Sequence, residues 1–358
     1  MSPLKKKLLH YIQSNGPMSV EKYMDLCLYD PDHGYYRVRN GIGTIGDFVT
    51  SPELSQLFGE LIGLWLAQVW VDQGKRQPFA LVELGPGRGT LMSDILRSTS
   101  VVPQFNKAAS IFLIEVSEKL KKVQQQCLSK HTITWLKSIE ELPEIPIFAI
   151  GNEFLDALPV RQFKRTNGVW KERCVSLDSN FNLFYCYVPS SFHTELQFLH
   201  GSVPDNEVIE VCDKAKGFIS KFSNKILKNS GCALFIDYAH FGQLGDTFQA
   251  VRNHSFVDPL KNLGESDLTC HVDFKTITDA AQFNGLRASK ILTQRDFLLN
   301  LGIEKRVNYL VRNLNEKEKH SIILAKNRLI NKDGMGDLFK VVGITPKTAP
   351  DLPILGKI

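Results

Sequence analysis

The segment that most constrains the fold is residues 80–92, which read ALVELGPGRGTLM. An apolar run that ends at Glu83 leads into the alternating glycines Gly85, Gly87 and Gly89, and a helical pattern follows. This order predicts a strand, a tight loop and the start of a helix. Glycines let the backbone adopt left-handed angles and leave room for a ligand, and the free N–H groups at a helix start point toward that ligand. The segment therefore predicts the binding loop of a nucleotide-like cofactor.

The spacing within the loop decides between two kinds of cofactor. A dinucleotide loop has the pattern G-x-G-x-x-G, with an acid about 20 residues further on. Here Pro86 stands between the first two glycines, and Thr90 occupies the position of the third dinucleotide glycine. With Glu83 the loop reads E-x-G-x-G-x-G, which resembles the first motif of S-adenosylmethionine (SAM)-dependent methyltransferases. A carboxylate suits SAM, which is cationic at its sulfur and its amine, better than it suits a pyrophosphate. We therefore expect SAM, with a dinucleotide site or a plain glycine-rich turn as the alternatives.

Strands and helices alternate from residue 79 onward. The predicted strands are residues 79–84, 110–116, 147–152, 232–237, 288–294 and 338–344. This alternation predicts an α/β fold, with a mostly parallel sheet covered by helices and ligands beyond the carboxyl ends of its strands. Residues 160–188 instead alternate at period two around turn sequences, which predicts a small antiparallel β insertion. From residue 207 to 228 the spacing returns to that of a helix.

The N-terminal part of the sequence predicts helices and a loop that lies over the cofactor site. Residues 41–53 are too rich in glycine for a regular element, and they run into a helix with Ser51 as its expected cap and Pro52 as its first residue. This loop, which contains Asp47 and Thr50, is predicted to be a lid or second wall of the cofactor site; an ordinary surface loop is the alternative. The chain is accordingly divided into residues 1–75 with the N-terminal helices and lid loop, 76–160 with the first part of the core, 161–205 with the β insertion, and 206–358 with the rest of the core and the substrate-side helices.

Acidic and amide side chains follow several predicted strands. Glu115 ends the second strand, where an acid can accept both hydrogen bonds of a ribose diol; a surface acid is the alternative. Asn152, Glu153 and Asp156 follow the next strand, where unpaired carboxylates are costly to desolvate. A cationic acceptor such as a guanidinium would offset this cost through bidentate hydrogen bonds. A helix-capping role for Asn152 or Asp156 is the alternative, and Asp237, after a later strand, is expected near the same cleft.

Polar groups also gather in residues 267–274. Asp267, His271 and Asp273 have side chains of the kind that bind metals, but a hydrogen-bonded histidine near the site or a substrate-positioning loop fits the segment better. No metal site is therefore predicted. No G-x-S-x-G, H-E-x-x-H or Walker pattern occurs in the sequence, which argues against hydrolase and phosphotransfer activities.

The composition is that of a globular protein, with 43% hydrophobic and 23% charged residues. The net charge of +5 has no dense basic block behind it, so nucleic acid is not an expected partner. The seven cysteines form no C-x-x-C pair, which fits a reducing compartment. No run reaches the roughly 18 apolar residues that a membrane span needs, and no signal- or transit-peptide pattern opens the chain. We expect a bacterial cytoplasmic protein, or a mature form in the mitochondrial matrix.

Four motifs occur in the order typical of one known family. They are GDFVTSPE (46–53), ELGPGRGT (83–90), NEFLDALP (152–159) and DLTCHVDF (267–274). Together they resemble the MidA-like family, which includes the mitochondrial arginine methyltransferase needed for respiratory complex I assembly and its bacterial relatives. The resemblance spans nearly the whole chain.

The resemblance implies a Rossmann-like SAM-dependent methyltransferase fold and, for the mitochondrial member, dimethylation of an arginine on a complex I subunit. The loop of residues 46–53 would close over the cofactor, and S-adenosylhomocysteine would be the product. The residues expected at the cofactor are Asp47, Thr50, Ser51, Glu83, Gly85, Pro86, Gly87, Gly89, Glu115 and Asn152. The residues expected to align the acceptor and take its proton are Glu153 and Asp156, with Asp47 and His271 as further candidates.

The favoured hypothesis is methyl transfer from SAM to an arginine nitrogen of a protein partner, by in-line displacement at the sulfonium carbon. A second hypothesis is a non-catalytic assembly factor that binds SAM for stability and grips a partner subunit. A third is a nicotinamide-dependent oxidoreductase, which Thr90 disfavours. A homodimer is a possible assembly, and the motifs fix neither the acceptor nor the number of methyl groups transferred.

Overall fold

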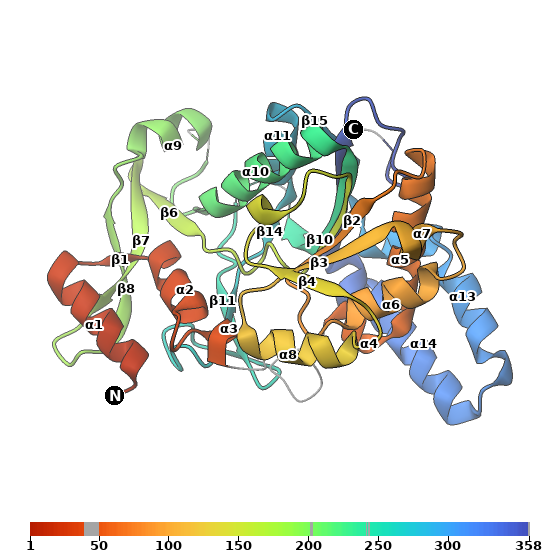
Figure 1. The fold of residues 1–358 in the computed structure, drawn as a ribbon. Helices are drawn as coiled ribbons and strands as arrows, with labels where there is room; N and C mark the ends of the chain where they lie inside the picture. Colours follow the sequence, from red (N-terminus) through yellow and green to blue (C-terminus); the bar gives the residue numbers. More distant parts are fainter. Residues whose placement is uncertain (39–49, 201–202, 241, 243, 357–358) are drawn as a thin grey trace.

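The computed structural model describes the chain except for residues 39–49, 201–202, 241, 243 and 357–358 (Figure 1). Its largest element is a nine-stranded sheet. The strands are β2 (Phe79–Leu84), β3 (Ala109–Ile114), β4 (Ile133–Leu136), β5 (Ile147–Asn152), β10 (Gly231–His240), β14 (Val272–Asp273), β15 (Leu286–Ala288), β16 (Leu292–Thr293) and β17 (Phe339–Pro346). Along the main path their order is β15-β17-β10-β5-β2-β3-β4, with β14 beside β10 and β16 beside β17.

The strands β2, β3, β4, β5 and β10 run parallel, so their carboxyl ends meet at one edge of the sheet, while β17 is antiparallel to β10. The strands predicted over residues 79–84 and 147–152 have the bounds of β2 and β5. The strand predicted over 288–294 is wrong, because the segment divides into β15 and β16 and a helix begins at Gln294. The division follows from Ser289, whose hydroxyl accepts the Gly343 N–H in place of a backbone partner (2.9 Å). The short strand β4 was not predicted.

Helices cover both faces of this sheet. One core joins the sheet to α5 (Gln56–Asp72), α6 (Thr90–Thr99), α12 (Gln294–Asn300), α13 (Ile303–Leu310) and α14 (Glu316–Ile330). A second core joins the other face to α10 (Asp213–Asn229) and α11 (Phe274–Phe283). The period-two alternation of β2 produces this division, since Leu81 belongs to the first core and Val82 to the second. The remaining helical segments in these parts are α7 (Phe105–Ala108), α8 (Glu118–Cys127), η1 (Ile139–Glu141), η2 (Val311–Asn313) and η3 (Lys332–Gly336).

The N-terminal helices are α1 (Pro3–Asn15), α2 (Val20–Tyr29), α3 (Tyr35–Val38) and α4 (Ser51–Leu54). The single helix predicted to begin with Ser51 as its cap is wrong in two respects. The cap position of α4 is Thr50, and α4 ends after four residues because Ser55 is extended. The Ser55 hydroxyl then accepts the Leu57 N–H and starts the separate helix α5 (3.3 Å).

A second sheet contains the antiparallel strands predicted between residues 160 and 188. Its five strands are β1 (Met18–Ser19), β6 (Arg161–Thr166), β7 (Val169–Leu177), β8 (Leu183–Pro189) and β9 (Val208–Val211), and α9 (His193–His200) lies between β8 and β9. The helix predicted from residue 207 is wrong at its start, because residues 208–211 pair with β6 and α10 begins at Asp213. A third, small sheet consists of β11 (Gln249–Arg252), β12 (Ser255–Val257) and β13 (Asp267–Thr269).

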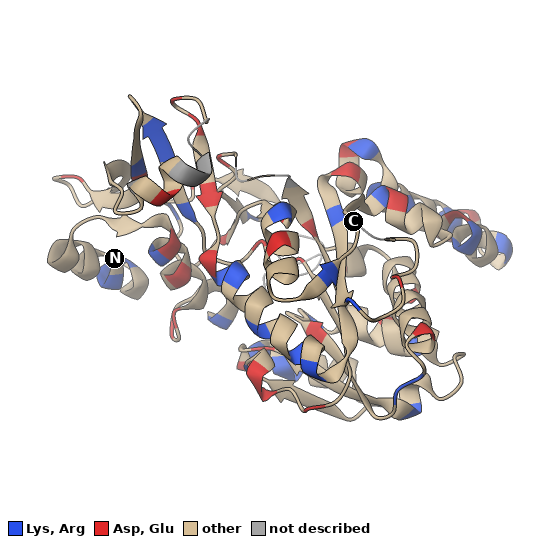
Figure 2. Ribbon diagram, turned by 90° about the horizontal axis from the view of Figure 1, so that it is seen from above, with Lys and Arg blue, Asp and Glu red and all other residues tan. Residues whose placement is uncertain are grey.

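The N-terminal helices, the second sheet and the third sheet share one apolar core, which includes Leu8, Met24, Val175 and Leu268. This core holds α2 and α3 beside the carboxyl edge of the large sheet (Figure 1). Figure 2 shows acidic and basic residues interspersed along the arm of α13 and α14. The two helices contain six Lys or Arg residues and three Glu residues, so they carry +3 of the formal net charge of +5. Within the described ranges, no helix combines the length and the apolar character that a membrane crossing requires.

Candidate functional site

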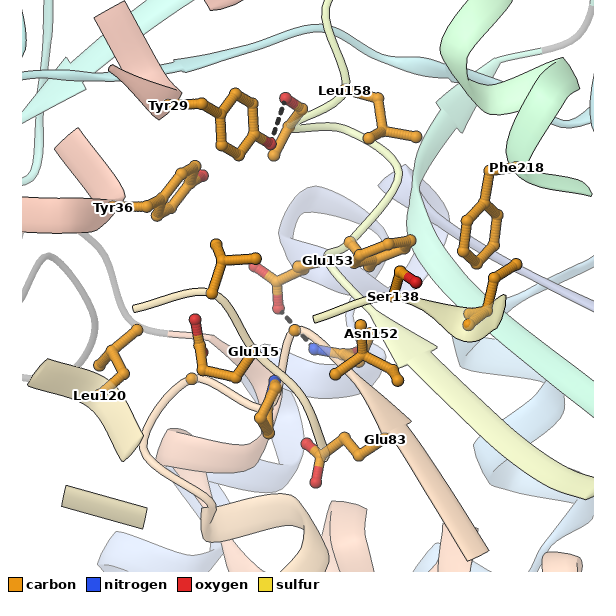
Figure 3. Close-up of a pocket in the computed structure, with 18 of the residues that line it drawn as sticks. Tyr29, Tyr36, Glu83, Glu115, Leu120, Ser138, Asn152, Glu153, Leu158 and Phe218 are labelled. Atoms are coloured by element: carbon orange, nitrogen blue, oxygen red, sulfur yellow. Dashed lines mark hydrogen bonds between the residues drawn. The ribbon is translucent and has the colours of Figure 1, made fainter. Parts of the chain in front are cut away.

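A cavity of about 630 Å³ opens at the carboxyl ends of β2, β3 and β5, where the parallel sheet predicted a ligand (Figure 3). The residues expected at the cofactor that line it are Thr50, Glu83, Gly85, Pro86, Gly87, Glu115 and Asn152. Of the expected catalytic residues, Glu153 lines this cavity. Ser51 and Gly89 do not line it: the Ser51 N–H bonds the lining residue Glu153, and Gly89 precedes α6. Asp47 lies outside the described residues.

The glycine loop leaves β2 and turns sharply into α6. Gly85, Gly87 and Gly89 have φ values of 62°, 51° and 85°, the left-handed region that favours glycine. Gly89 is the residue before the first turn of α6. A Cβ atom at Gly85 would lie 3.2 Å from the Phe154 ring, so the loop also passes close to the wall on which Glu153 stands. The backbone therefore forms the narrow cradle that the sequence predicted.

Glu83 lies beneath this cradle with almost no exposed surface. Burial raises the pKa of Glu83 well above its ordinary value, and the Met92 N–H partly opposes that rise by donating to the carboxylate. The Oε2 atom has no hydrogen-bond partner among the described residues. A buried carboxylate oxygen without a partner is costly, and an ammonium group bound in the cradle would satisfy it. The site thus fits the cationic methionine end of SAM.

Glu115 is held in place by Gln124, a residue of α8 that the sequence gave no reason to select. The fully buried Gln124 amide donates to the Gly87 carbonyl (2.8 Å) and to Glu115 Oε2 (3.1 Å). Its oxygen accepts the Trp135 indole N–H (2.8 Å), which fixes the orientation of the amide. The second carboxylate oxygen of Glu115 accepts the Ser117 N–H (2.7 Å). One side chain therefore ties the expected ribose acid to the glycine loop.

Replacing Gln124 with Leu is expected to weaken binding of S-adenosylhomocysteine roughly tenfold, because the buried Glu115 carboxylate and the Gly87 carbonyl each lose a donor worth about 1 kcal/mol or more. Calorimetric titration measures the change. Gln125, the next residue of the same helix, is exposed, so Gln125→Leu is the matched control and should bind as the wild-type protein does. Equal affinities for the two variants would show that Gln124 does not set the geometry of the site.

Glu153 follows β5 in a left-handed backbone conformation with φ of 50°, which is uncommon for a residue other than glycine. Its N–H donates to the Ile236 carbonyl (2.9 Å), which anchors the turn to β10. Its Oε1 atom accepts hydrogen bonds from the Asn152 amide (3.0 Å) and the Ser51 N–H (3.3 Å). Figure 3 shows the carboxylate directed into the cavity. Burial, and next the charge of Asp156, raise the pKa of Glu153 to about 7.

Asp237, at the end of β10, shapes the loop that carries Glu153. Its Oδ2 atom accepts the backbone N–H groups of Phe154 (3.1 Å), Leu155 (2.9 Å) and Asp156 (3.3 Å). The pKa of Asp237 is raised well above its ordinary value, first by burial and then by the neighbouring acids Asp156 and Glu153. The loop wraps around this carboxylate, so Asp237 acts as a positioning residue and does not line the main cavity.

The same wrapping turns Asp156 away from the main cavity. Asp156 and His271 line a small neighbouring cavity of about 30 Å³, so the structure does not bring these two expected catalytic residues to Glu153. Burial raises the pKa of Asp156 to about 6, and the Tyr238 hydroxyl bonds its carboxylate. The ring of His271 packs edge-on against the ring of Tyr238, with centroids 5.5 Å apart.

The other polar residues of the segment 267–274 have separate structural partners. Asp267 accepts the Tyr36 hydroxyl (2.8 Å), and Asp273 caps α11 by accepting the Lys275 N–H (3.0 Å). In the parts of the chain that the structure describes, no three His, Cys, Asp or Glu side chains are grouped to hold a metal ion.

Comparison with known proteins gives three findings. The model of a family described as "Putative S-adenosyl-L-methionine-dependent methyltransferase" matches residues 61–292. The human protein named "Protein arginine methyltransferase NDUFAF7, mitochondrial" is 35% identical, over 97% of this chain and 84% of its own length; its Drosophila melanogaster homolog is 34% identical, over 96% and 85%. The crystal structure of a Burkholderia thailandensis protein bound to S-adenosyl-homocysteine is 28% identical, with a TM-score of 0.86 over 99% of this chain and 95% of that one.

Proposed function

We propose that this chain, which belongs to the MidA-like family of S-adenosyl-L-methionine-dependent methyltransferases, transfers a methyl group from SAM to an arginine nitrogen of a protein. The observation that carries the choice of acceptor is Glu153, a half-buried carboxylate that faces the cavity beside the glycine loop. The human and fly relatives are named protein arginine methyltransferases, which supports the same choice.

The residues of the cradle fit SAM in three parts. Glu83 would pair with its ammonium group, the loop from Gly85 to Gly89 would lie along its methionine part, and Glu115 would accept the hydrogen bonds of its ribose diol. Thr50 and Asn152 line the cavity on the side of Glu153. SAM supplies an electrophilic methyl group on a positively charged sulfur.

Glu153 would align the acceptor and take its proton. A guanidinium stays protonated in water because its pKa exceeds about 12, so the proton leaves as the new bond forms. The methyl carbon bonds to the nitrogen while its bond to sulfur breaks, the sulfur becomes neutral, and the nitrogen's proton passes to Glu153. Asn152 and Ser51 hold one oxygen of the carboxylate, which leaves the other for the guanidinium. Positioning and exclusion of water would supply most of the rate enhancement.

The activity is expected to depend on pH through Glu153. Only the ionised carboxylate can bind the cation and accept its proton, and the pKa of Glu153 is raised to about 7 by burial and by the charge of Asp156. As the pH falls through that value, kcat/KM for the acceptor should fall about tenfold per pH unit; above it, kcat/KM should be level. The positive sulfur of SAM favours the carboxylate, so the midpoint in the cofactor complex should lie at or below about 7. A pH–rate profile that stays level down to about pH 5 would contradict this role.

We further propose that the acceptor is a subunit of a complex I-type respiratory enzyme, methylated where such subunits are assembled, in the mitochondrial matrix or the bacterial cytoplasm. The word "mitochondrial" in the names of the relatives supports this setting. The homodimer stays a prediction.

Mass spectrometry tests the acceptor. The protein is incubated with methyl-labelled SAM and purified complex I subunits, and the labelled residues are identified in digests. Label on arginine nitrogens supports the proposal, whereas label on lysine alone, or on small molecules alone, contradicts it.

A further inference from the structure

Two tyrosines from the N-terminal helices line the cavity on the side away from the glycine loop. Tyr29 is the last residue of α2 and Tyr36 lies in α3. Figure 3 shows both rings across the cavity from Glu83 and Glu115, with Glu153 between the two sides. Each ring is half-buried, and both line the cavity. The cofactor-binding residues expected from the sequence do not account for this wall.

The hydroxyl groups of both tyrosines are already engaged. Tyr29 donates to the Ala157 carbonyl (3.0 Å), on the loop that carries Glu153, and Tyr36 donates to Asp267 Oδ1 (2.8 Å). Burial, followed by neighbouring carboxylates, raises the pKa of both phenols far above the ordinary value, so both rings are neutral. The two groups therefore present neutral ring surface to the cavity.

The two rings are packed obliquely, with centroids 5.6 Å apart and planes inclined at 37°. A neutral aromatic face attracts a cation, and arginine uses such faces more often than lysine because its planar, weakly hydrated guanidinium can stack on them. Asp156 and Asp267 lie close enough to both tyrosines to raise their pKa values, so the local charge is negative. This environment suits a planar cation.

We propose that Tyr29 and Tyr36 form the acceptor subsite of this cavity and select an arginine side chain by stacking its guanidinium while Glu153 holds the nitrogen that reacts. The inference rests on the proposed function and deepens it, because it names the side chains that distinguish arginine from lysine. It also gives the N-terminal helices a role in specificity, since α2 and α3 supply the wall that faces the cofactor loop.

Four basic residues line the cavity, namely Arg88, Lys137, Lys214 and Lys221. Three of the basic residues that line the cavity have acidic partners of their own. These pairs are Lys214 with Asp25 (2.5 Å), Lys221 with Glu140 (2.6 Å) and Arg88 with Glu53 (4.0 Å). The first two join α10 to α2 and η1, so they brace the walls of the cavity and leave the tyrosine faces to an incoming side chain.

The test measures binding of small acceptor analogues to the protein loaded with S-adenosylhomocysteine. N-acetyl-arginine amide, N-acetyl-lysine amide and N-acetyl-citrulline amide are titrated by NMR at millimolar concentration, against wild type, Tyr36→Leu and Tyr36→Phe. Tyr36→Phe keeps the ring and loses the hydroxyl. Tyr309→Leu is the matched control, because Tyr309 is an exposed tyrosine of the remote helix α13. Thermal melting and S-adenosylhomocysteine affinity verify that each variant is folded and loaded.

We expect the wild-type protein to bind the arginine amide more tightly than the other two amides. In Tyr36→Leu this difference in affinity should fall about tenfold. In Tyr36→Phe and Tyr309→Leu it should be unchanged. If wild type prefers arginine and Tyr36→Leu still prefers it to the same degree, the tyrosine subsite is wrong while the arginine acceptor stands. If wild type binds the three amides equally, or none of them, the subsite is wrong; labelled arginine in the mass-spectrometric experiment would then decide the acceptor separately. Should Tyr36→Leu not fold, loss of the preference in Tyr29→Leu supports the subsite, and its retention overturns it.

Discussion

Replacing Glu153 with Gln is expected to lower methyl transfer by about 10²- to 10⁴-fold, the range typical for loss of a general base, while binding of S-adenosylhomocysteine stays unchanged. The amide has nearly the same shape as the carboxylate, so the turn anchored by Ile236 is preserved. It carries no charge to hold a guanidinium and cannot accept the departing proton. The measurements are single-turnover transfer from labelled SAM and calorimetric titration with the product cofactor.

Glu140→Gln is the matched control, because Glu140 also lines the cavity but is half-exposed and pairs with Lys221 at its mouth. That variant should keep its rate. Full activity of Glu153→Gln would remove Glu153 from the mechanism.

The same variant separates the enzyme from the assembly-factor hypothesis. Glu153→Gln that folds, binds SAM and still restores assembly of respiratory complexes in cells lacking the protein would favour a scaffold that uses the cofactor for stability. Failure to restore assembly, with cofactor binding intact, would show that the methyl transfer itself is required.

Replacing Gly85 with Val is expected to weaken S-adenosylhomocysteine binding by at least about a hundredfold, which corresponds to roughly 2.7 kcal/mol. Gly85 has φ of 62°, where a β-branched residue is strained by about 1–3 kcal/mol. Its new Cβ would also lie 3.2 Å from the Phe154 ring, and the rest of the side chain would add bulk where the loop must approach the ligand. Both effects displace the loop from the position at which its backbone faces the cofactor.

Gly168→Val is the control for backbone strain. Gly168 lies in the turn between β6 and β7 with φ of 74° and has nothing within 4 Å of an added Cβ. Both variants should melt at a lower temperature than wild type, but only Gly85→Val should lose the cofactor. Equal affinities in calorimetric titration would mean that the loop does not bind the ligand.

The sequence alone predicted the central strands of the large sheet and the loop that follows its first strand. The bounds of β2 and β5, the tight loop after Glu83, and a cavity at the carboxyl ends of the strands are consequences of local patterns. Apolar runs, glycine spacing and turn residues act over fewer than about a dozen neighbours, so they can be interpreted without tertiary information. The same reasoning placed Glu115 and Glu153 in one cleft, because the ends of parallel strands meet at one edge.

Errors occurred where distant partners override local preference. Residues 208–211 have helical spacing, but they pair with β6 across the chain. The strand predicted over 288–294 breaks because the Ser289 side chain takes a backbone donor from β17. Neither partner can be identified from the neighbouring sequence.

The tertiary structure decided the details of the site. Asp156 stands three residues after Glu153, yet the convergence of three backbone N–H groups on Asp237 turns it into a different cavity. Gln124 contacts the glycine loop because α8 packs beside it, and Tyr29 and Tyr36 line the far side of the cavity because an apolar core holds the N-terminal helices there. The sequence by itself determined the central parallel strands β2 and β5 and the polar residues that follow them. Which side chains meet depends on packing between segments that are 37 to 231 residues apart in these examples, and local sequence patterns do not specify such contacts.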